Sequence, residues 1–545
     1  MPWTGGGTLD GRRYRGPVQP PVPERFRPLV DATEPLAERF RRAGHRVYLV
    51  GGSVRDALVE RPSGQRSVDT GAVGPDTVRS DAGDAVGPDA GGPEPSSLDA
   101  EGAPPPSDFD LTTDARPDEI ERLVRGWADA VWTQGKRFGT IGLRSGGRVY
   151  EVTTHRAEAY RPDSRKPDVT FGNEVETDLS RRDFTVNAMA LELPDLRLVD
   201  PFDGLADLAA HRLRTPLDPE VSFDDDPLRM LRAARFAAAY GLVPEPALVD
   251  AVRKGHHRLS IVSAERIRDE LDKIMVLPAP GPSRALRFTV ETGLCDEFLP
   301  ELPALRLEQD PVHRHKDVLA HTLAVVDKTS PDRLLRLAAL FHDVGKPRTR
   351  AFGPEGVTFH YHDEVGARMT RKRMEALRYS KDDIDTVVEL VRLHLRFHTY
   401  RLGWSDRAVR RYVRDAGPLL ERLNELTRSD CTTRNEAKAR ALARRMDELE
   451  ARIGELREQE ELDAIRPDLN GTQVMARLGI PPGRTVGEAL AFLLELRLDE
   501  GPLGEEEAGR RLDDWWAARG GSSRPVAQGA RKGRRAATRE DRHLR

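Results

Sequence analysis

Two aspartates, Asp108 and Asp110, are two residues apart in the string D-F-D-L-T-T-D. On a strand, residues at i and i+2 point to the same face, so both carboxylates should leave one face of a sheet. Neighbouring carboxylates repel each other unless a cation lies between them, and Mg²⁺ prefers carboxylate and phosphate oxygens as ligands. The pair therefore predicts a Mg²⁺ site for phosphoryl chemistry.

A phosphate-binding turn is predicted upstream, in the string Y-L-V-G-G-S-V-R-D-A-L at residues 48–58. Its first three residues read as a strand, Gly51 and Gly52 end that strand, and Ser53 is expected to cap a helix. Glycines allow the backbone to approach a phosphate, a helix start offers free N–H groups, and Arg55 adds positive charge. Either motif alone usually marks an ordinary turn or a solvated strand, whereas the combination favours a nucleotide site.

Arginines recur every three residues on a helix predicted to begin at Pro227, in the string F-D-D-D-P-L-R-M-L-R-A-A-R-F-A. Proline in the first turn, directly after an aspartate, is typical of a helix start. Arg229, Arg232 and Arg235 drift slowly around such a helix, so at least two of them can face one ligand. An amphipathic surface helix is the alternative explanation.

These motifs resemble a known family. The G-G turn with D-x-D is similar to the head domain of the polymerase beta-like nucleotidyltransferases. The strings L-V-G-G-x-V-R-D, R-R-D-F-T-x-N-A and D-P-x-x-G resemble the CCA tRNA nucleotidyltransferase and bacterial poly(A) polymerase family, class II. The resemblance spans Val47 to Leu496 and implies that Asp108 and Asp110 are catalytic. The nucleotide-binding residues that it implies are Gly51, Gly52, Arg55, Arg182, Asp183, Asn187, Asp226, Arg229, Arg232 and Arg235.

In this family a D-x-x-R pair reads the base, and Asp226 and Arg229 occupy those positions. A carboxylate accepts from the exocyclic amine that C and A share, and an arginine donates to a ring nitrogen or carbonyl. The wrong base would leave buried polar groups unpaired, so G and U should be rejected. Many relatives have glutamate where this chain has Asp225, a mild departure. Glu151 could be a third metal carboxylate, and a strand-surface glutamate is an equally good explanation.

A second group of residues resembles the HD phosphohydrolase superfamily. The apolar stretch Leu337–Lys346 contains a His-Asp dipeptide, and the glycine that follows it is expected to end the helix. A buried, satisfied pair would be the default explanation, but the spacing of further His and Asp residues resembles the metal-binding H…HD…D set, in which the metal activates water. The set comprises His321, His342, Asp343 and Asp430, with His362 and His394 as candidate ligands of a second ion. Soft ligands are absent, so Mg²⁺, Mn²⁺, Ni²⁺ or Co²⁺ fits.

At 545 residues the chain exceeds one compact core, so several domains are expected. The resemblance implies an α+β fold for them. A small mixed β-sheet forms the nucleotidyltransferase head, and a mostly α-helical neck, body and tail follow, including an all-α HD domain. A helix is expected at Pro35–Ala43. The predicted domains are a disordered leader (1–24), the head (25–220, with a disordered insertion at 61–107), the neck (221–300), the HD domain (301–434), a helical tRNA-binding body and tail (435–519) and a disordered basic end (520–545).

Composition favours a soluble cytoplasmic protein. Charged residues make up 32% of the chain, there is no apolar run of about 18 residues, and the N-terminus lacks the pattern of a signal peptide. Two cysteines, Cys295 and Cys431, do not make a disulfide framework. The net charge of −4 is weak evidence against nucleic-acid binding, because 86 Lys and Arg residues can still cluster locally.

The predicted function is addition of CCA to the tRNA 3′ end from CTP and ATP, with no membrane partner. The string L-G-I-P-P-G-R-T-V-G-E-A-L resembles the family's tail, which implies that Arg484 contacts tRNA phosphates. One alternative is a poly(A) polymerase or an enzyme that adds only A. Another is an HD metal-dependent phosphohydrolase on RNA ends with a degenerate head, and a third is a non-catalytic RNA-binding protein. The intact D-x-D and D-x-x-R strings argue against a degenerate head.

Overall fold

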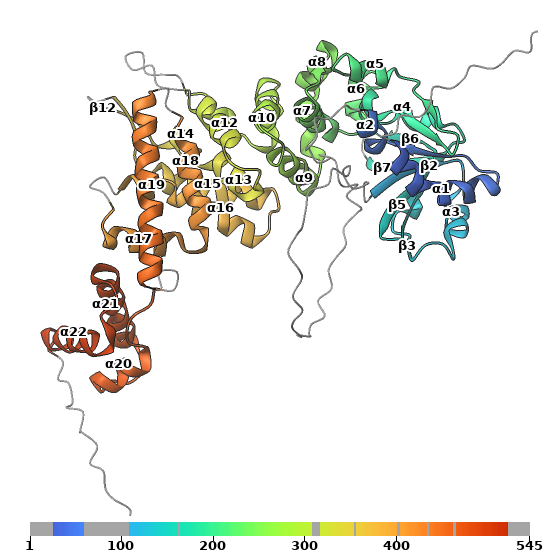
Figure 1. Ribbon diagram of the computed structural model, residues 1–545. Helices are drawn as coiled ribbons and strands as arrows, with labels where there is room; N and C mark the ends of the chain where they lie inside the picture. Colours follow the sequence, from blue (N-terminus) through green and yellow to red (C-terminus); the bar gives the residue numbers. More distant parts are fainter. Residues whose placement is uncertain are drawn as a thin grey trace, which may run out of the picture. The chain divides into compact units, whose positions relative to one another are not determined.

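The computed structural model describes residues 26–58, 108–161, 164–307, 317–353, 356–399, 404–432, 435–460 and 465–520 (Figure 1). The chain divides into two compact units. The first comprises Met1–Pro303 and Ala376–Arg378, and the second comprises Ala304–Glu375 and Tyr379–Arg545. The predicted leader 1–24 and insertion 61–107 lie outside the described residues, as does the predicted basic end 520–545 except for Gly520.

The first unit contains a seven-stranded mixed sheet, in the order β3-β4-β5-β2-β1-β8-β9. β2 and β5 are parallel, and the other neighbours in this sheet are antiparallel. The strands are β1 (Val47–Val50), β2 (Asp108–Thr113), β3 (Ala130–Trp132), β4 (Thr140–Ser145), β5 (Arg148–Thr154), β8 (Ala190–Leu193) and β9 (Arg197–Val199). The predicted mixed sheet of the head is confirmed.

Two helices, α1 (Arg27–Arg42) and α3 (Pro117–Val124), bury their apolar side chains against one face of this sheet. Phe109 and Leu111 of β2 point into that core. Because side chains alternate along a strand, the two aspartates of β2 emerge on the opposite face.

Two local predictions near the N-terminal part of the sheet were wrong. The helix expected at Pro35–Ala43 begins earlier, at Arg27, because Leu29 and Ala32 extend its buried stripe, so Pro35 lies inside the helix. Helix α2 (Gly52–Leu58) begins at Gly52, which places Ser53 in its first turn and not at the cap.

The remaining elements of the first unit follow in a mostly helical order. Within the head they are η2 (Lys136–Phe138), the pair β6 (Arg156–Arg161) and β7 (Ser164–Phe171), α4 (Val175–Ser180), η3 (Thr185–Asn187), α5 (Gly204–Ala209) and β10 (Arg212–Leu213). The neck contains α6 (Pro219–Asp225), α7 (Leu228–Tyr240), β11 (Val243–Pro244), α8 (Pro246–Gly255), η4 (His256–Ile261), α9 (Ala264–Met275), α10 (Gly281–Glu291) and α11 (Cys295–Phe298). The short helix η5 (Pro303–Leu305) spans the boundary between the two units.

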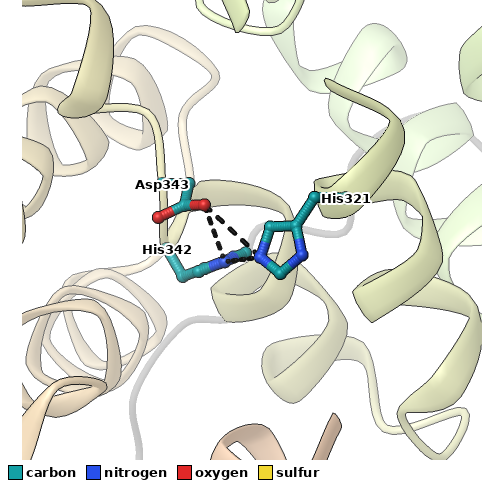
Figure 2. Close-up of side chains that lie close together, drawn as sticks. All are labelled: His321, His342 and Asp343. Atoms are coloured by element: carbon teal, nitrogen blue, oxygen red, sulfur yellow. Dashed lines mark hydrogen bonds and ion pairs between the residues drawn. The ribbon is translucent and has the colours of Figure 1, made fainter. Parts of the chain in front are cut away.

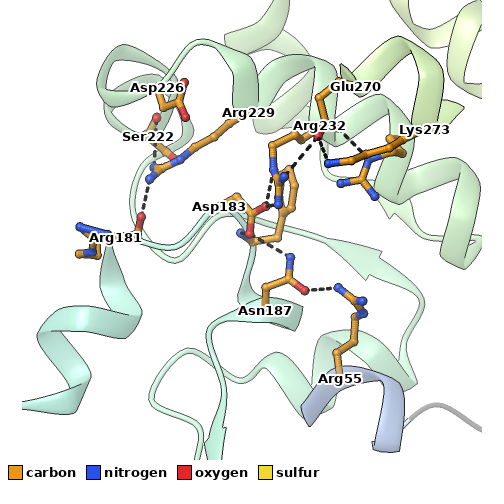
Figure 3. A network of polar contacts seen from close by, with 12 residues as sticks. Arg55, Arg181, Asp183, Asn187, Ser222, Asp226, Arg229, Arg232, Glu270 and Lys273 are labelled. Carbon is orange, nitrogen blue, oxygen red and sulfur yellow. Dashed lines mark hydrogen bonds and ion pairs between the residues drawn. The ribbon is translucent and has the colours of Figure 1, made fainter. Parts of the chain in front are cut away.

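Charged side chains form a buried network in this unit (Figure 3). Nη2 of Arg232 on α7 lies 2.6 Å from Oδ2 of Asp183, and Nη1 lies 3.4 Å from Oε1 of Glu270 on α9. Nε of Arg235 donates to Oε2 of Glu270 at 2.7 Å. Burial alone would raise the pKa of Glu270, but Arg235, Arg232 and Lys273 outweigh it and lower that pKa to about 2. The network is therefore charged at neutral pH and ties α7 and α9 to the turn that carries Asp183.

The described residues of the second unit are helical apart from an antiparallel hairpin, β12 (Arg350–Gly353) with β13 (Gly356–Phe359), which was not predicted from the sequence. Among the residues described in either unit, no helix is both long and apolar enough to cross a membrane. The helices are α12 (Val318–Lys328), α13 (Arg333–Phe341), α14 (Lys346–Thr349), α15 (His362–Ala376), α16 (Lys381–Leu393), η6 (Arg396–Thr399), α17 (Asp406–Ala416), η7 (Gly417–Leu419), α18 (Leu420–Asp430), α19 (Glu436–Gln459), α20 (Gly471–Leu478), α21 (Arg484–Glu500) and α22 (Gly504–Ala518).

We expect Glu270→Gln to lower the free energy of unfolding by about 3–5 kcal/mol, because it removes the carboxylate that buried Arg235 contacts. Urea denaturation measures the loss, and Glu265→Gln, at an exposed position of the same helix, should cost less than about 0.5 kcal/mol. The pKa of Glu270 is lowered from 4.5 to about 2, so its contribution is present above pH 4.5 and lost as the pH falls toward 2. A difference between wild type and Glu270→Gln that persists at pH 2 would contradict this assignment.

Candidate active site

Three carboxylates share the open face of the head sheet. Asp108 and Asp110 are exposed on β2, and the parallel register places Asp110 opposite Glu151 on β5. Burial raises the pKa of Glu151 to about 7, and the charges of Asp110 and Asp108 contribute to the shift. Oxygen donors that repel one another in this way suit a hard divalent cation such as Mg²⁺.

The glycine turn after β1 leaves room for an arginine from another segment to lie beside these carboxylates. Gly51 has a φ of +71°, and a Cβ placed on it would lie 3.1 Å from Nη1 of Arg182 and 3.8 Å from Oδ2 of Asp110. A glycine therefore lets both groups approach the turn, and Gly52 begins α2 directly after it. Nε of Arg182 is buried and has no hydrogen-bond partner among the described residues.

Arg182 also lines a cavity of about 310 Å³, within the size range of small-ligand sites, about 300–1,000 Å³. Thr153 of β5, two residues after Glu151, belongs to the same wall, so the cavity adjoins the carboxylate face. Five arginines against three aspartates give the lining the positive charge that a triphosphate requires. The lining residues are Thr153, Asp178, Arg181, Arg182, Asp183, Asp226, Leu228, Arg229, Arg232 and Arg266.

The predicted base readers both line this cavity. Oδ2 of Asp226 accepts a hydrogen bond from Nη2 of Arg266 at 2.8 Å. Arg229 donates through Nη1 to Oγ of Ser222 at 2.9 Å and through Nη2 to the carbonyl of Arg181. Arg266, on α9, was missed by the sequence analysis because it lies 40 residues from Asp226, and no local pattern signals their contact.

Four of the predicted nucleotide-binding residues build the framework beside the cavity (Figure 3). Nδ2 of Asn187 donates to Oδ1 of Asp183 at 2.9 Å, and Nη1 of Arg55 donates to Oδ1 of Asn187 at 2.5 Å. The side chains of Arg55 and Arg235 are 0% exposed, and neither belongs to the cavity lining. The structure thus places these two arginines behind the surface that a nucleotide could touch.

In the second unit, the predicted HD ligands lie together (Figure 2). Nε2 of His321 is 3.2 Å from Nε2 of His342. The same Nε2 atom is 2.9 Å from Oδ1 of Asp430. Nε2 of His342 is 3.2 Å from Oδ2 of Asp343. These side chains come from α12, the turn after α13, and the end of α18, so the helical packing assembles them.

A second pair of histidines lies beside the other oxygen of Asp343. Nε2 of His362 is 3.5 Å from Oδ1 of Asp343 and 3.2 Å from Nε2 of His394. Nδ1 of His342, His362 and His394 each lies 2.6–2.8 Å from a backbone carbonyl. A carbonyl only accepts, so each Nδ1 carries a proton, and each Nε2 is directed to the centre of the cluster, where it can bind a metal once it is deprotonated. This donor set fits two divalent cations that share Asp343.

The charges in this cluster also favour a cation. Burial would lower the pKa of His342, but Asp343 and Asp430 outweigh it and raise that pKa to about 10, so a proton sits where the carboxylates attract positive charge. Burial and the charge of His342 lower the pKa of His394 to about 4. His394 is therefore neutral, the form in which histidine binds a metal.

Outside these two clusters, the structure places Arg484 at the start of α21, where its side chain is 93% exposed. Nε of Arg484 lies 3.0 Å from Oε1 of Glu488 in the next helical turn. An exposed guanidinium with only a local partner is available to a larger ligand.

Three family models match the chain in order. "Poly A polymerase head domain" matches residues 101–214, "Probable RNA and SrmB- binding site of polymerase A" matches 241–305, and "HD domain" matches 317–453. The first contains the carboxylate strand and Arg182, and the third contains the histidine cluster.

Proteins of similar sequence support the same family assignment. The A-adding tRNA nucleotidyltransferase of Deinococcus radiodurans is 37% identical over 63% of this chain and 80% of its own length. The CCA-adding enzyme of Lactobacillus johnsonii is 34% identical over 49% of this chain, which spans 54% of that enzyme.

Solved structures show the same fold. The Bacillus stearothermophilus CCA-adding enzyme in complex with CTP matches 92% of this chain and 99% of its own, with a TM-score of 0.60 and 22% identity. The predicted family resemblance and the predicted α+β fold are confirmed. The chain belongs to the family of tRNA nucleotidyltransferases and bacterial poly(A) polymerases, as a member with an HD domain.

Proposed function

We propose that the protein is a template-independent nucleotidyltransferase that adds CCA to tRNA 3′ ends from CTP and ATP in the cytoplasm. One observation carries the proposal: the carboxylate face of β2 and β5 adjoins, through Arg182, a cavity lined by Asp226 and Arg229. The tRNA-modifying relatives support the choice of substrate. The exposed Arg484 is proposed to contact tRNA phosphates.

In the proposed reaction, the tRNA 3′-hydroxyl attacks the α-phosphate of the nucleotide, and pyrophosphate leaves. Mg²⁺ held by Asp108 and Asp110, with Glu151 as a third carboxylate, would neutralise phosphate charge and make the hydroxyl more acidic. Arg182, which lines the cavity, holds the triphosphate through its guanidinium, while the turn at Gly51 and Gly52 lets phosphates approach the backbone.

Base selection is assigned to the cavity wall. Asp226 accepts from the exocyclic amine of C or A in place of Arg266, which releases the carboxylate when the base arrives. Arg229 donates to the base from its contacts with Ser222 and Arg181. We assign the buried Arg55 and Arg235 to holding this wall in place.

A second candidate is an enzyme that adds only A, or a poly(A) polymerase on the same head. The specific observation in its favour is the A-adding relative of Deinococcus radiodurans, which matches this chain at higher identity and over a larger share of its length than the Lactobacillus johnsonii CCA-adding enzyme. The cavity described above presents the same base-facing groups to C and to A, so it does not separate these candidates.

Incorporation of each labelled NTP onto tRNA transcripts that end before CCA, after C and after CC tests the proposal. We expect C and A to be incorporated and G and U to be rejected, because Asp226 and Arg229 match the 4-amino group of C and the 6-amino group of A. Two C and then one A, after which addition stops, would establish the CCA reading. Addition of A alone, or of long A tails, would establish the second candidate. No incorporation of any NTP with Mg²⁺ or Mn²⁺ would refute both.

We expect Asp108→Ala to reduce nucleotide addition by on the order of 10³-fold or more, because it removes a ligand of the metal that neutralises transition-state charge. Binding of tRNA, measured by filter retention, should change little. Asp195→Ala, at an exposed aspartate of the same unit, is the matched control and should leave both readouts unchanged. Normal addition by folded Asp108→Ala would refute the carboxylate assignment.

We also propose an accessory phosphohydrolase at the HD cluster. Mg²⁺, Mn²⁺, Ni²⁺ or Co²⁺ held there would activate a water molecule for attack on a phosphoester. Nζ of Lys346 lies 2.6 Å from Oδ2 of Asp343, where it orients this carboxylate toward the histidines.

We expect His342→Ala to remove hydrolysis of p-nitrophenyl phosphate and to spare nucleotide addition, because the two sites use separate ligands. Both activities are measured on the same preparation, with each of the four metals. His257→Ala, at an exposed histidine of the first unit, should retain both activities. Loss of addition in a folded His342→Ala variant would show that the two sites are coupled.

A further inference from the structure

Two aromatic side chains beside the HD cluster are strongly exposed. Tyr361 is 78% exposed and Phe352 is 71% exposed, the highest values among the exposed large apolar residues in the described parts of the chain. Burying rings of this size is favourable, so such exposure within ten residues of each other indicates a surface that acquires a ligand.

The hairpin β12–β13 places Phe352 on one face with other aromatic and cationic side chains. Its register pairs Arg350 with Phe359 and Phe352 with Val357, so these four side chains point to the same side. The guanidinium of Arg350 lies 4.7 Å from the centre of the Phe352 ring. The face is thus aromatic and cationic together.

Lys346 connects this face to the histidine cluster. Its Nζ lies 2.6 Å from Oδ2 of Asp343 and 5.8 Å from the centre of the Phe359 ring. Phe359 in turn accepts, through its carbonyl, the Nδ1 proton of His362 at 2.8 Å. The hairpin face therefore lies directly beside the candidate metal ligands.

The backbone at the end of the hairpin is strained. Tyr361 has a φ of +60°, a conformation that bulky residues rarely adopt. It directly precedes His362, and strain of this kind is typically retained where a side chain has to be presented in a set direction. Here the strained residue projects an exposed ring beside a candidate ligand.

We propose that Phe352, Phe359 and Tyr361 form a stacking platform that binds the bases of a single-stranded RNA end and presents its terminal phosphoester to the HD cluster. The proposal rests on the accessory phosphohydrolase proposed above and adds the side chains that would hold the RNA end beside it. Aromatic rings with adjacent cations suit this ligand, since bases stack on rings irrespective of sequence while Lys346 and Arg350 attract the phosphates.

Photo-crosslinking of the full chain tests the platform. The probe is an oligonucleotide of about five residues that contains 5-iodouridine and ends in a 3′-phosphate, without added metal. We expect crosslinked peptides to contain residues 350–361. Phe352→Ala and Tyr361→Asn should each weaken this crosslink and the anisotropy-measured affinity about tenfold, the typical effect of losing one stacked base. Phe352→Trp should retain both, and Val243→Ala, at a 66% exposed position of the first unit, is the matched control.

Hydrolysis assays with the same variants distinguish failure of the stacking platform from failure of the proposed phosphohydrolase. Phe352→Ala should lower kcat/KM for the oligonucleotide phosphate about tenfold and leave p-nitrophenyl phosphate, which has no base, unaffected. If no metal supports any hydrolysis while the crosslink depends on Phe352, the phosphohydrolase fails and the platform stands. Crosslinks elsewhere only, unchanged affinity in both variants, or a shift from dimer to monomer in Phe352→Ala would overturn the platform.

Discussion

The buried contact between Asp183 and Arg232 is the interaction on which the first unit depends. Burial would raise the pKa of Asp183, but Arg232 and Asn187 outweigh it and hold that pKa well below its usual range. Buried ion pairs stabilise a fold only when their remaining polar atoms also find partners, and Asn187 and Glu270 supply them here. The same contact ties the helical neck to the sheet and fixes one wall of the cavity.

The two candidate sites use a common device: a glycine permits close approach, and contacts behind the site then fix the reactive side chains. At the carboxylate face, Gly51 admits Arg182 beside Asp110. In the second unit, a Cβ on Gly345 would lie 2.1 Å from the carbonyl oxygen of His362, so a side chain there would push the His-Asp turn away from α15. Each site therefore depends on backbone packing as much as on its ligands.

Local patterns in the sequence predicted the parts of the fold that local forces decide. Alternation along β2 placed Asp108 on an open face, and the helix start near Pro227 lies within one residue of the observed α7. Contacts between distant segments could not be predicted from the sequence. The burial of Arg235 depends on Glu270, 35 residues away, and a periodic row of arginines looks the same whether or not such a partner exists. The hairpin at Arg350–Phe359 likewise depends on strand pairing, and its short strands carry no sequence pattern that predicts this pairing.

The contact between Asp226 and Arg266 bears on how the proposed base selection would work. The carboxylate already accepts a hydrogen bond at 2.8 Å, so an arriving C or A exchanges one donor for another and gains little net free energy at this atom. G or U would present a carbonyl instead, which displaces the arginine and leaves Asp226 facing another acceptor. Specificity is a difference between affinities, and leaving a buried polar group unpaired costs more than a good hydrogen bond contributes. Selection at Asp226 would therefore act mainly by rejecting G and U.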